Sequence, residues 1–138
     1  MATSRPRPIV EAEIKRTLGL VPSFFNRMPD DTLDLEWTLF RRFEMEEAGM
    51  AIPAKFRQLM GVAIHSETKC EYCTLFHTEL AMLLGATDEE VQEAVHYAKH
   101  TLGISAYLNG IREPRERFAE ELERIIEYLS NKPLPKAV

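Results

Sequence analysis

The spacing of apolar residues along the chain predicts helices throughout. Apolar positions recur every three or four residues in segments 53–65 and 114–129, which is the pattern of a helix with one buried face. Glycines, prolines and capping residues separate such segments. The period of two that marks a half-buried strand is found nowhere in the sequence. We therefore expect an all-α protein, a single-domain bundle of about six to seven helices.

The expected helices have ends marked by proline, glycine or capping residues, and in chain order they span about residues 9–18, 23–28, 30–48, 53–65, 70–84, 87–102 and 114–130. Gly103 is expected to loosen the chain after the sixth of them. Residues 1–8 alternate arginine with proline and are expected to form a flexible arm, and residues 131–138 a frayed tail. One domain, 1–138, is long enough to bury most of a core without staples.

The helix around Trp37 has a wide apolar face. Its apolar residues between Leu33 and Phe43 cover an arc of about 200°, whereas a helix that packs on one side shows an arc of about 100°. Such a helix needs cover on two sides. It either crosses the middle of the domain or also packs against a second subunit, and we expect a homo-oligomer.

The two cysteines of the chain occur in one motif, Cys70-x-x-Cys73, with His77 four residues further on. Residues 66–69 interrupt an apolar run and are expected to supply the turn and the N-cap from which a helix begins near Cys70. At about 100° per residue, Cys73 lies about 60° from Cys70 and His77 about 40° from Cys73 on such a helix. The three side chains therefore share one narrow stripe at the start of a helix that lies centrally in the chain.

This stripe has the chemistry of a thiol redox site. The thiolate is the reactive form of cysteine, and a helix N-terminus together with a nearby imidazole lowers the pKa of a thiol. His77 can also take the thiol proton and later return it to a leaving oxygen. Two alternatives remain open: two cysteines that simply pack beside a hydrogen-bonded core histidine, and a zinc site. Structural zinc uses four ligands, and only His65 and Glu67 are nearby to complete a shell, so we expect no metal and no cofactor.

Composition narrows the class of protein. Apolar residues make up 45% and charged residues 28% of the chain, which is an ordinary globular balance. A net charge of −5, without a long cluster of lysine and arginine, disfavours a nucleic-acid partner. Neither a secretory signal nor an apolar run long enough for a membrane span is found. With both cysteines in one motif, we expect a cytoplasmic protein with a transient, catalytic disulfide.

The Cys70-x-x-Cys73-x-x-x-His77 element and the segments that flank it resemble the alkyl hydroperoxidase D-like branch of the carboxymuconolactone decarboxylase superfamily. The resemblance covers about residues 50 to 110 and includes the run from Ile52 to Ala63 before the motif and the run from His77 to Val95 after it. It implies an all-helical, oligomeric, thiol-dependent peroxidase, either a trimer or a hexamer. It further implies that Cys73 attacks the peroxide and that Cys70 resolves the sulfenic acid to a disulfide.

The sequence departs from the pattern of this branch at two positions. Twelve residues before Cys70, where the branch usually has a glutamate of a proton relay, this chain has Gln58. A glutamine cannot carry a proton between partners, and Glu67 is the most economical substitute for the missing carboxylate. Between the cysteines stands Tyr72, where the branch often has histidine or serine. His65, near the end of its helix, is expected to be a capping or hydrogen-bonded residue rather than a catalytic one, and Tyr107 is a further residue that can approach the site.

We expect a thiol peroxidase in which Cys73, Cys70, His77 and Glu67 are catalytic and Gln58, His65, Tyr72 and Tyr107 surround them. The expected substrate is a hydroperoxide. The resemblance implies an external dithiol, such as a lipoyl-type carrier, or a peroxiredoxin as partner. A thiol-disulfide oxidoreductase or redox-regulated binding protein is the alternative, and it makes the glutamine at position 58 easier to accept. A decarboxylase of carboxymuconolactone type is disfavoured, because that branch does not rely on a Cys-x-x-Cys pair.

Overall fold

The computed structural model describes residues 4–132, and every regular element in that range is a helix, as the sequence predicted. In chain order the elements are α1 (Arg7–Leu18), α2 (Ser23–Asn26), α3 (Asp30–Phe40), the π-helical turn η1 (Arg41–Met45), α4 (Ala54–Thr68), α5 (Glu71–Leu83), α6 (Asp88–Gly110) and α7 (Arg115–Ser130). Within residues 4–132, no helix has the length and apolar character that crossing a membrane requires.

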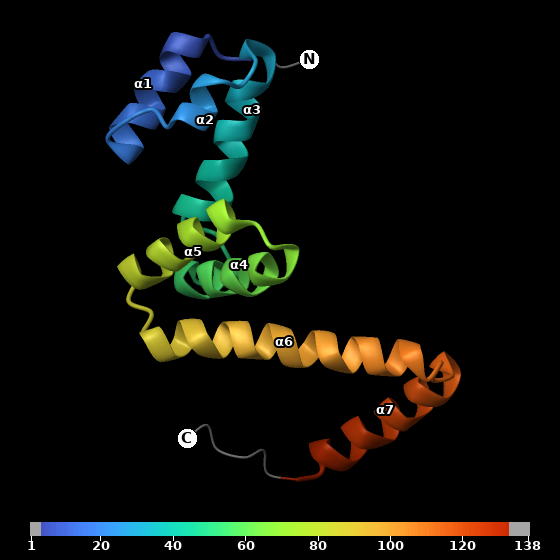
Figure 1. Ribbon diagram of the computed structural model, residues 1–138. Coiled ribbons are helices and arrows are strands. Elements are labelled where there is room, and N and C mark those ends of the chain that lie inside the picture. The colour runs from blue at the N-terminus through green and yellow to red at the C-terminus, as the bar shows by residue number, and fades with distance from the viewer. Residues whose placement is uncertain (1–3, 133–138) are drawn as a thin grey trace.

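The first three helices pack around a small aromatic core at one end of the molecule (Figure 1). Its fully buried residues are Val10, Ile14, Phe25, Leu33 and Trp37. Phe25 meets Trp37 edge to face, with 5.6 Å between the ring centroids. Only one side of α3 is covered, since Leu35 and Leu39 on its remaining surface are exposed. The second cover that its wide apolar face calls for is therefore not provided by the described part of the chain.

The N-terminal segment differs from the expected flexible arm. α1 begins already at Arg7, because Pro6 takes the N-cap position and a proline in the first turn needs no intrahelical N–H bond. The Arg5 backbone N–H and its guanidinium Nε donate to the Asp34 carboxylate over 2.7 Å and 2.8 Å, and the guanidinium also pairs with Glu13. Asp34 is 29 residues and Glu13 eight residues from Arg5, so the composition of residues 1–8 alone did not reveal these contacts. Residues 1–3 of the expected arm and 133–138 of the expected tail lie outside the described residues.

η1 joins this N-terminal unit to a pair of antiparallel helices, α4 and α5, which pack against each other (Figure 1). In η1 the backbone N–H of Glu46 donates to the carbonyl of Arg41, five residues earlier, over 2.9 Å. The expected helix from residue 30 to 48 is thus interrupted, with Phe40 as the last residue of its α-helical part. α4 also packs along the first part of α6.

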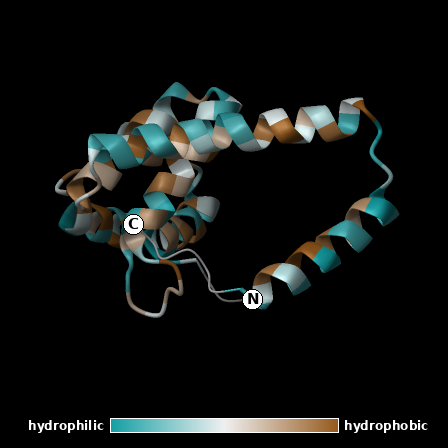
Figure 2. Ribbon diagram, turned by 90° about the horizontal axis from the view of Figure 1, so that it is seen from below, coloured by the Kyte–Doolittle hydropathy of each residue, from teal (hydrophilic) through white to brown (hydrophobic). Residues whose placement is uncertain are grey.

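The last two helices extend away from the rest of the chain. α6 runs without interruption to Gly110, so the expectation that Gly103 loosens the chain was wrong; one glycine in a helix interior costs only about 1 kcal/mol. At its first turn Thr87 and Glu90 form a capping box, in which each side chain accepts the backbone N–H of the other residue. The second half of α6 projects past α4 and α5, and α7 turns back beneath it (Figure 1). Hydrophobic residues remain visible along both helices in Figure 2, and neither helix has a buried residue.

Candidate active site

The cysteine pair lies at the start of α5, as predicted, and is closed as a disulfide. The N-cap of α5 differs from the expected one. α4 continues through Thr68, Lys69 turns the chain in the left-handed region at φ 58°, and Cys70 itself caps α5 by accepting the N–H of Cys73 on its sulfur over 3.3 Å. Both cysteines are half-buried, so a reduced pair lies at a positively polarised helix end that remains within reach of a substrate. Tyr72, between them, is 87% exposed.

His77 is buried one turn after Cys73, where α5 passes over α4. Its Nδ1 lies 2.7 Å from the amide oxygen of Gln58. The imidazole also lies directly over Gly61 of α4, where an added Cβ would be 2.5 Å from the His77 Cγ and Nδ1 atoms. Gly61 is therefore a site residue that the cysteine motif did not reveal, although a glycine in the middle of a helical segment was a usable signal.

Gln58 is fully buried, and its two ends have different partners. The amide Nε2 donates to a carboxylate oxygen of Glu44 over 3.0 Å and approaches the Glu44 carbonyl at 3.4 Å. Since both of these partners are acceptors, the amide nitrogen faces Glu44 and the amide oxygen faces His77. An amide oxygen only accepts, so Nδ1 of His77 is the donor. Neutral His77 is consequently the Nδ1–H tautomer, and its Nε2 is free to accept a proton.

Glu44 was not among the predicted site residues. It lies in η1, and one of its carboxylate oxygens is 3.8 Å from Nδ1 of His77. Burial lowers the pKa of His77 below its ordinary value, the charge of Glu44 opposes this shift, and the neighbouring His65 adds to it. The lowered pKa favours the neutral imidazole, which is the form that accepts a proton.

His65 was expected to be a capping or hydrogen-bonded residue; it is hydrogen-bonded, and it also lies at the centre of the site. Its ring stacks on that of His77 with 5.1 Å between centroids and 7° between planes. A ring nitrogen of His65 and the sulfurs of Cys70 and Cys73 all lie within 4.8 Å of one another, whereas His77 is not part of this group. Its Nδ1 is also 3.2 Å from the hydroxyl of Thr68, in the last turn of α4.

Among the described residues, these three are also the group whose ligand atoms lie close enough together to bind a metal ion. Closed in a disulfide, the sulfurs are not thiolate ligands, and structural zinc takes four ligands in place of the three in this group. The arrangement suits thiol chemistry with two adjacent imidazoles better than a closed metal centre.

Two further predicted residues are exposed to solvent. Glu67 is exposed near the end of α4, and its proposed role in proton transfer stays a prediction. Tyr107 is 62% exposed in the last turn of α6, on the part of that helix that projects away from α4 and α5 (Figure 1). This chain therefore does not bring its own Tyr107 to the cysteines.

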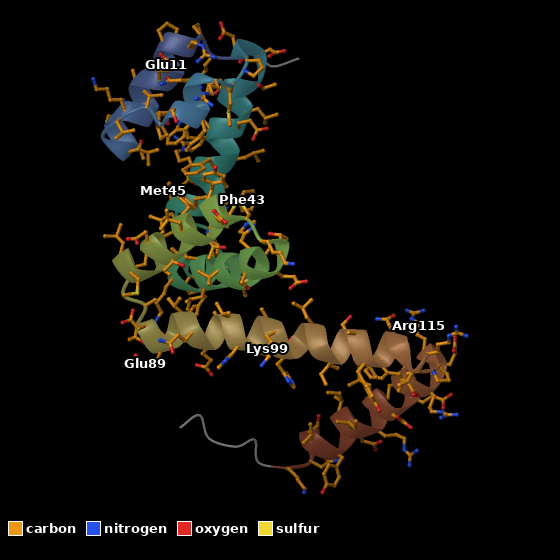
Figure 3. The ribbon with its side chains drawn as sticks, viewed as in Figure 1. Glu11, Phe43, Met45, Glu89, Lys99 and Arg115 are labelled. Carbon is orange, nitrogen blue, oxygen red and sulfur yellow. A yellow bond between two sulfur atoms is a disulfide. The ribbon has the colours of Figure 1, made fainter. Side chains whose placement is uncertain are left out.

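An apolar cavity of about 510 Å³ opens beside the two imidazoles. Its apolar walls come from η1, α4 and the loop between them, and they are formed by Phe43, Met50, Ala51, Ile52, Met60 and Ile64. Figure 3 shows Phe43 and Met45 where the N-terminal helices meet the α4–α5 pair. The polar groups that line the cavity are Glu44, Arg57, His65 and His77. His65 adjoins the cysteine sulfurs, and His77 stacks on His65. A ligand in the cavity thus lies one side chain away from the disulfide.

Comparisons with known proteins show the family of the chain and a structure with a similar fold. The model of the carboxymuconolactone decarboxylase family matches residues 36–116. The crystal structure of the alkylhydroperoxidase AhpD core from Rhodospirillum rubrum is similar, with a TM-score of 0.66 and 21% sequence identity over 81% of this chain and 85% of that chain. At this identity the likeness shows the fold alone. A comparison with curated protein sequences found no significant match.

Proposed function

The chain belongs to the carboxymuconolactone decarboxylase family, and we propose that within this family it is a thiol-dependent peroxidase that reduces organic hydroperoxides. One observation supports this proposal above all others. A closable cysteine pair occupies the N-terminus of α5, with one imidazole within 4.8 Å of both sulfurs and a second imidazole stacked on the first. Nucleophile, resolving thiol and proton acceptor are thereby within one cluster.

In the proposed reaction, the thiolate of Cys73 attacks the distal oxygen of the hydroperoxide. The O–O bond breaks, Cys73 becomes a sulfenic acid, and the alcohol leaves with a proton returned by an imidazole. Cys70 then loses its thiol proton to an imidazole and attacks the Cys73 sulfur. The S–O bond breaks, and the oxygen leaves as water with that proton as the disulfide forms. The disulfide of the structure corresponds to this product. An external dithiol restores both thiols by exchange.

The cavity suggests the class of hydroperoxide. Its volume of about 510 Å³ lies within the range of small-molecule sites, and its walls are mainly apolar. An alkyl or fatty-acyl chain buries apolar surface there, which hydrogen peroxide cannot do. We therefore propose that the reduced protein reacts with organic hydroperoxides in preference to hydrogen peroxide, with a small dithiol carrier or a peroxiredoxin as its redox partner.

The exposed helices support a proposed homo-oligomer, a trimer or hexamer. The apolar residues on one face of α7, all at least 43% exposed in the single chain, are Phe118, Leu122, Ile125, Ile126 and Leu129. Burying such a face contributes a favourable free energy of about 25 cal/mol per Å² of apolar surface. We propose that a second copy of the chain covers this face.

A single-turnover experiment tests the proposed activity. Fully reduced protein is mixed with cumene hydroperoxide, and intact mass follows the loss of two hydrogens. We expect stoichiometric conversion to the Cys70–Cys73 disulfide, no oxidation beyond background in Cys73→Ser, and a trapped sulfenic or overoxidised species in Cys70→Ser. Equal and unimpaired peroxide consumption by both variants would refute the assignment.

A second candidate function is thiol-disulfide exchange with a protein partner. The exposure of Tyr72 between the two cysteines favours it, because an incoming protein disulfide can approach the motif from solvent. Slow oxidation of the reduced protein by peroxide, together with rapid oxidation by a protein disulfide, would select this function.

A further inference from the structure

We propose that Glu44 is a positioning residue for His77: through Gln58, its carboxylate holds the imidazole as the Nδ1–H tautomer and leaves Nε2 free to take a proton from the cysteine pair. The contacts alone support this positioning role. Only the use made of the accepted proton rests on the proposed function.

The side-chain amide of Gln58 can be turned by 180°, and the carboxylate of Glu44 selects one of the two orientations. With nitrogen toward Glu44, Gln58 donates to the carboxylate at 3.0 Å. Turned around, it would direct its oxygen at that carboxylate and its NH₂ group at His77. The turned orientation places two acceptors together in a fully buried position, which is costly. The carboxylate therefore fixes the amide, and the amide fixes the imidazole.

A glutamine in this position transmits orientation without taking part in proton transfer. Its amide oxygen accepts the Nδ1–H bond of His77 at 2.7 Å but does not take the proton. Protons accordingly enter and leave His77 at Nε2 alone. A carboxylate bonded directly to Nδ1 would stabilise the imidazolium and raise the pKa of His77. The neutral glutamine avoids this effect, and the more distant Glu44 stabilises the imidazolium to a smaller extent.

The charged and titratable groups around His77 show which of them stabilises its protonated form. Glu44 approaches from η1, with its oxygen 3.8 Å from Nδ1. From α4 come His65, which stacks on the ring, and Arg57, which lines the same cavity. Cys70 and Cys73, at the start of α5, adjoin His65 on the other side of this stack and titrate once reduced. Among the groups that the described residues place beside His77, Glu44 is the carboxylate that stabilises the imidazolium formed on proton transfer.

The test combines a spectroscopic readout with a chemical one. ¹⁵N chemical shifts of the His77 ring in reduced, histidine-labelled protein report its tautomer and pKa, and the rate of alkylation by iodoacetamide against pH reports the thiolate. Glu44→Leu is expected to admit the Nε2–H tautomer, to lower the pKa of His77, and to slow alkylation of the thiols at pH 7 about tenfold. Glu44→Gln can face Gln58 with either end of its own amide, so it is expected to admit the Nε2–H tautomer in part and to lower the pKa of His77. Glu46→Gln removes the same charge two residues further on, where Glu46 pairs with Arg41, and should leave all readouts at the wild-type values.

A reciprocal exchange provides the rescue. Glu44→Gln combined with Gln58→Glu restores one carboxylate and one amide in swapped order, and it is expected to recover the Nδ1–H tautomer and to raise the pKa of His77 above that of wild type. Unchanged tautomer and pKa in both Glu44→Leu and Glu44→Gln, as in Glu46→Gln, would overturn the proposal. Should Glu44→Leu fail to fold, Glu44→Gln and the exchange variant decide. If peroxide does not oxidise the wild-type protein while His77 responds as described, the proposed activity fails and the role of Glu44 stands.

Discussion

Replacing Gly61 with alanine is expected to destabilise the protein, although alanine is the better helix former. The added Cβ would lie 2.5 Å from two atoms of the His77 ring, whereas carbon contacts are favourable at about 3.5–4.0 Å. The imidazole must therefore move by about 1 Å. It is held by its bond to Gln58 and by its stack on His65, so the movement disturbs both.

The expected magnitude follows from three contributions. Overpacking costs about 1–3 kcal/mol, and a weakened buried hydrogen bond costs about 1–3 kcal/mol more. Alanine regains about 1 kcal/mol of helix propensity. The free energy of unfolding of Gly61→Ala should thus fall by about 1–5 kcal/mol. Gly103→Ala is the matched control, because Gly103 is also within a helix and nothing lies within 4 Å of the position that an added Cβ would take; it should gain about 0.5–1 kcal/mol.

Urea denaturation at one fixed protein concentration measures both variants, with midpoints compared at constant m-value. A double-mutant cycle isolates the cause. If the cost comes from the ring, Gly61→Ala should be neutral or stabilising in a His77→Ala background. A Gly61→Ala protein as stable as wild type, with the ¹⁵N shifts of His77 unchanged, would refute the packing described for this pair.

Three further outcomes are expected. Arg5 holds the pKa of Asp34 below its ordinary value; burial acts to raise the pKa of Glu13, but Arg5 and Arg41 together lower it. The stabilisation is therefore present above the ordinary carboxyl pKa and is lost as the pH falls through the lowered values. Arg5→Ala, which leaves Arg41 beside Glu13, should lose about 1 kcal/mol or less at pH 7, with a shallower fall of stability below about pH 4. Ile125→Glu should reduce the sedimentation coefficient at micromolar concentration if α7 lies in a subunit interface, and an already monomeric wild-type protein would contradict the oligomer. Glu67→Gln should slow the peroxide step by about threefold without changing the urea midpoint, and an unchanged rate would return Glu67 to the class of solvated surface residues.

Local signals predicted the fold class and the position of the cysteine motif. The capping box at Thr87 and the proline at the start of α4 depend on residues a few positions apart, and the structure has both. The same holds for the start of α5 at the cysteines, although the residue that caps it is Cys70 itself. Periodicity and capping act over one or two turns, so a single sequence displays them directly.

The contacts that complete the site could not be read in this way. Glu44 meets Gln58 across 14 residues of sequence, and Arg5 meets Asp34 across 29. The π-helical turn shifts the helical phase after Phe40, so counting at 100° per residue does not lead to the orientation of Glu44. Gln58 looked like the loss of a carboxylate, whereas the structure supplies a carboxylate from another element.

The π-helical turn of η1 makes this site sensitive to a change in chain length. A π-turn accommodates one residue more than the α-helix around it and is frequent at functional sites. Deleting Arg42 or Phe43 would let the α-helix continue, and each following side chain would rotate by about 100° about the helix axis. Glu44 would then point away from Gln58 with its own chemistry intact. Such a one-residue deletion would therefore remove the carboxylate from the site even though the glutamate itself is kept. Related sequences with a different length at this turn would place another residue beside Gln58.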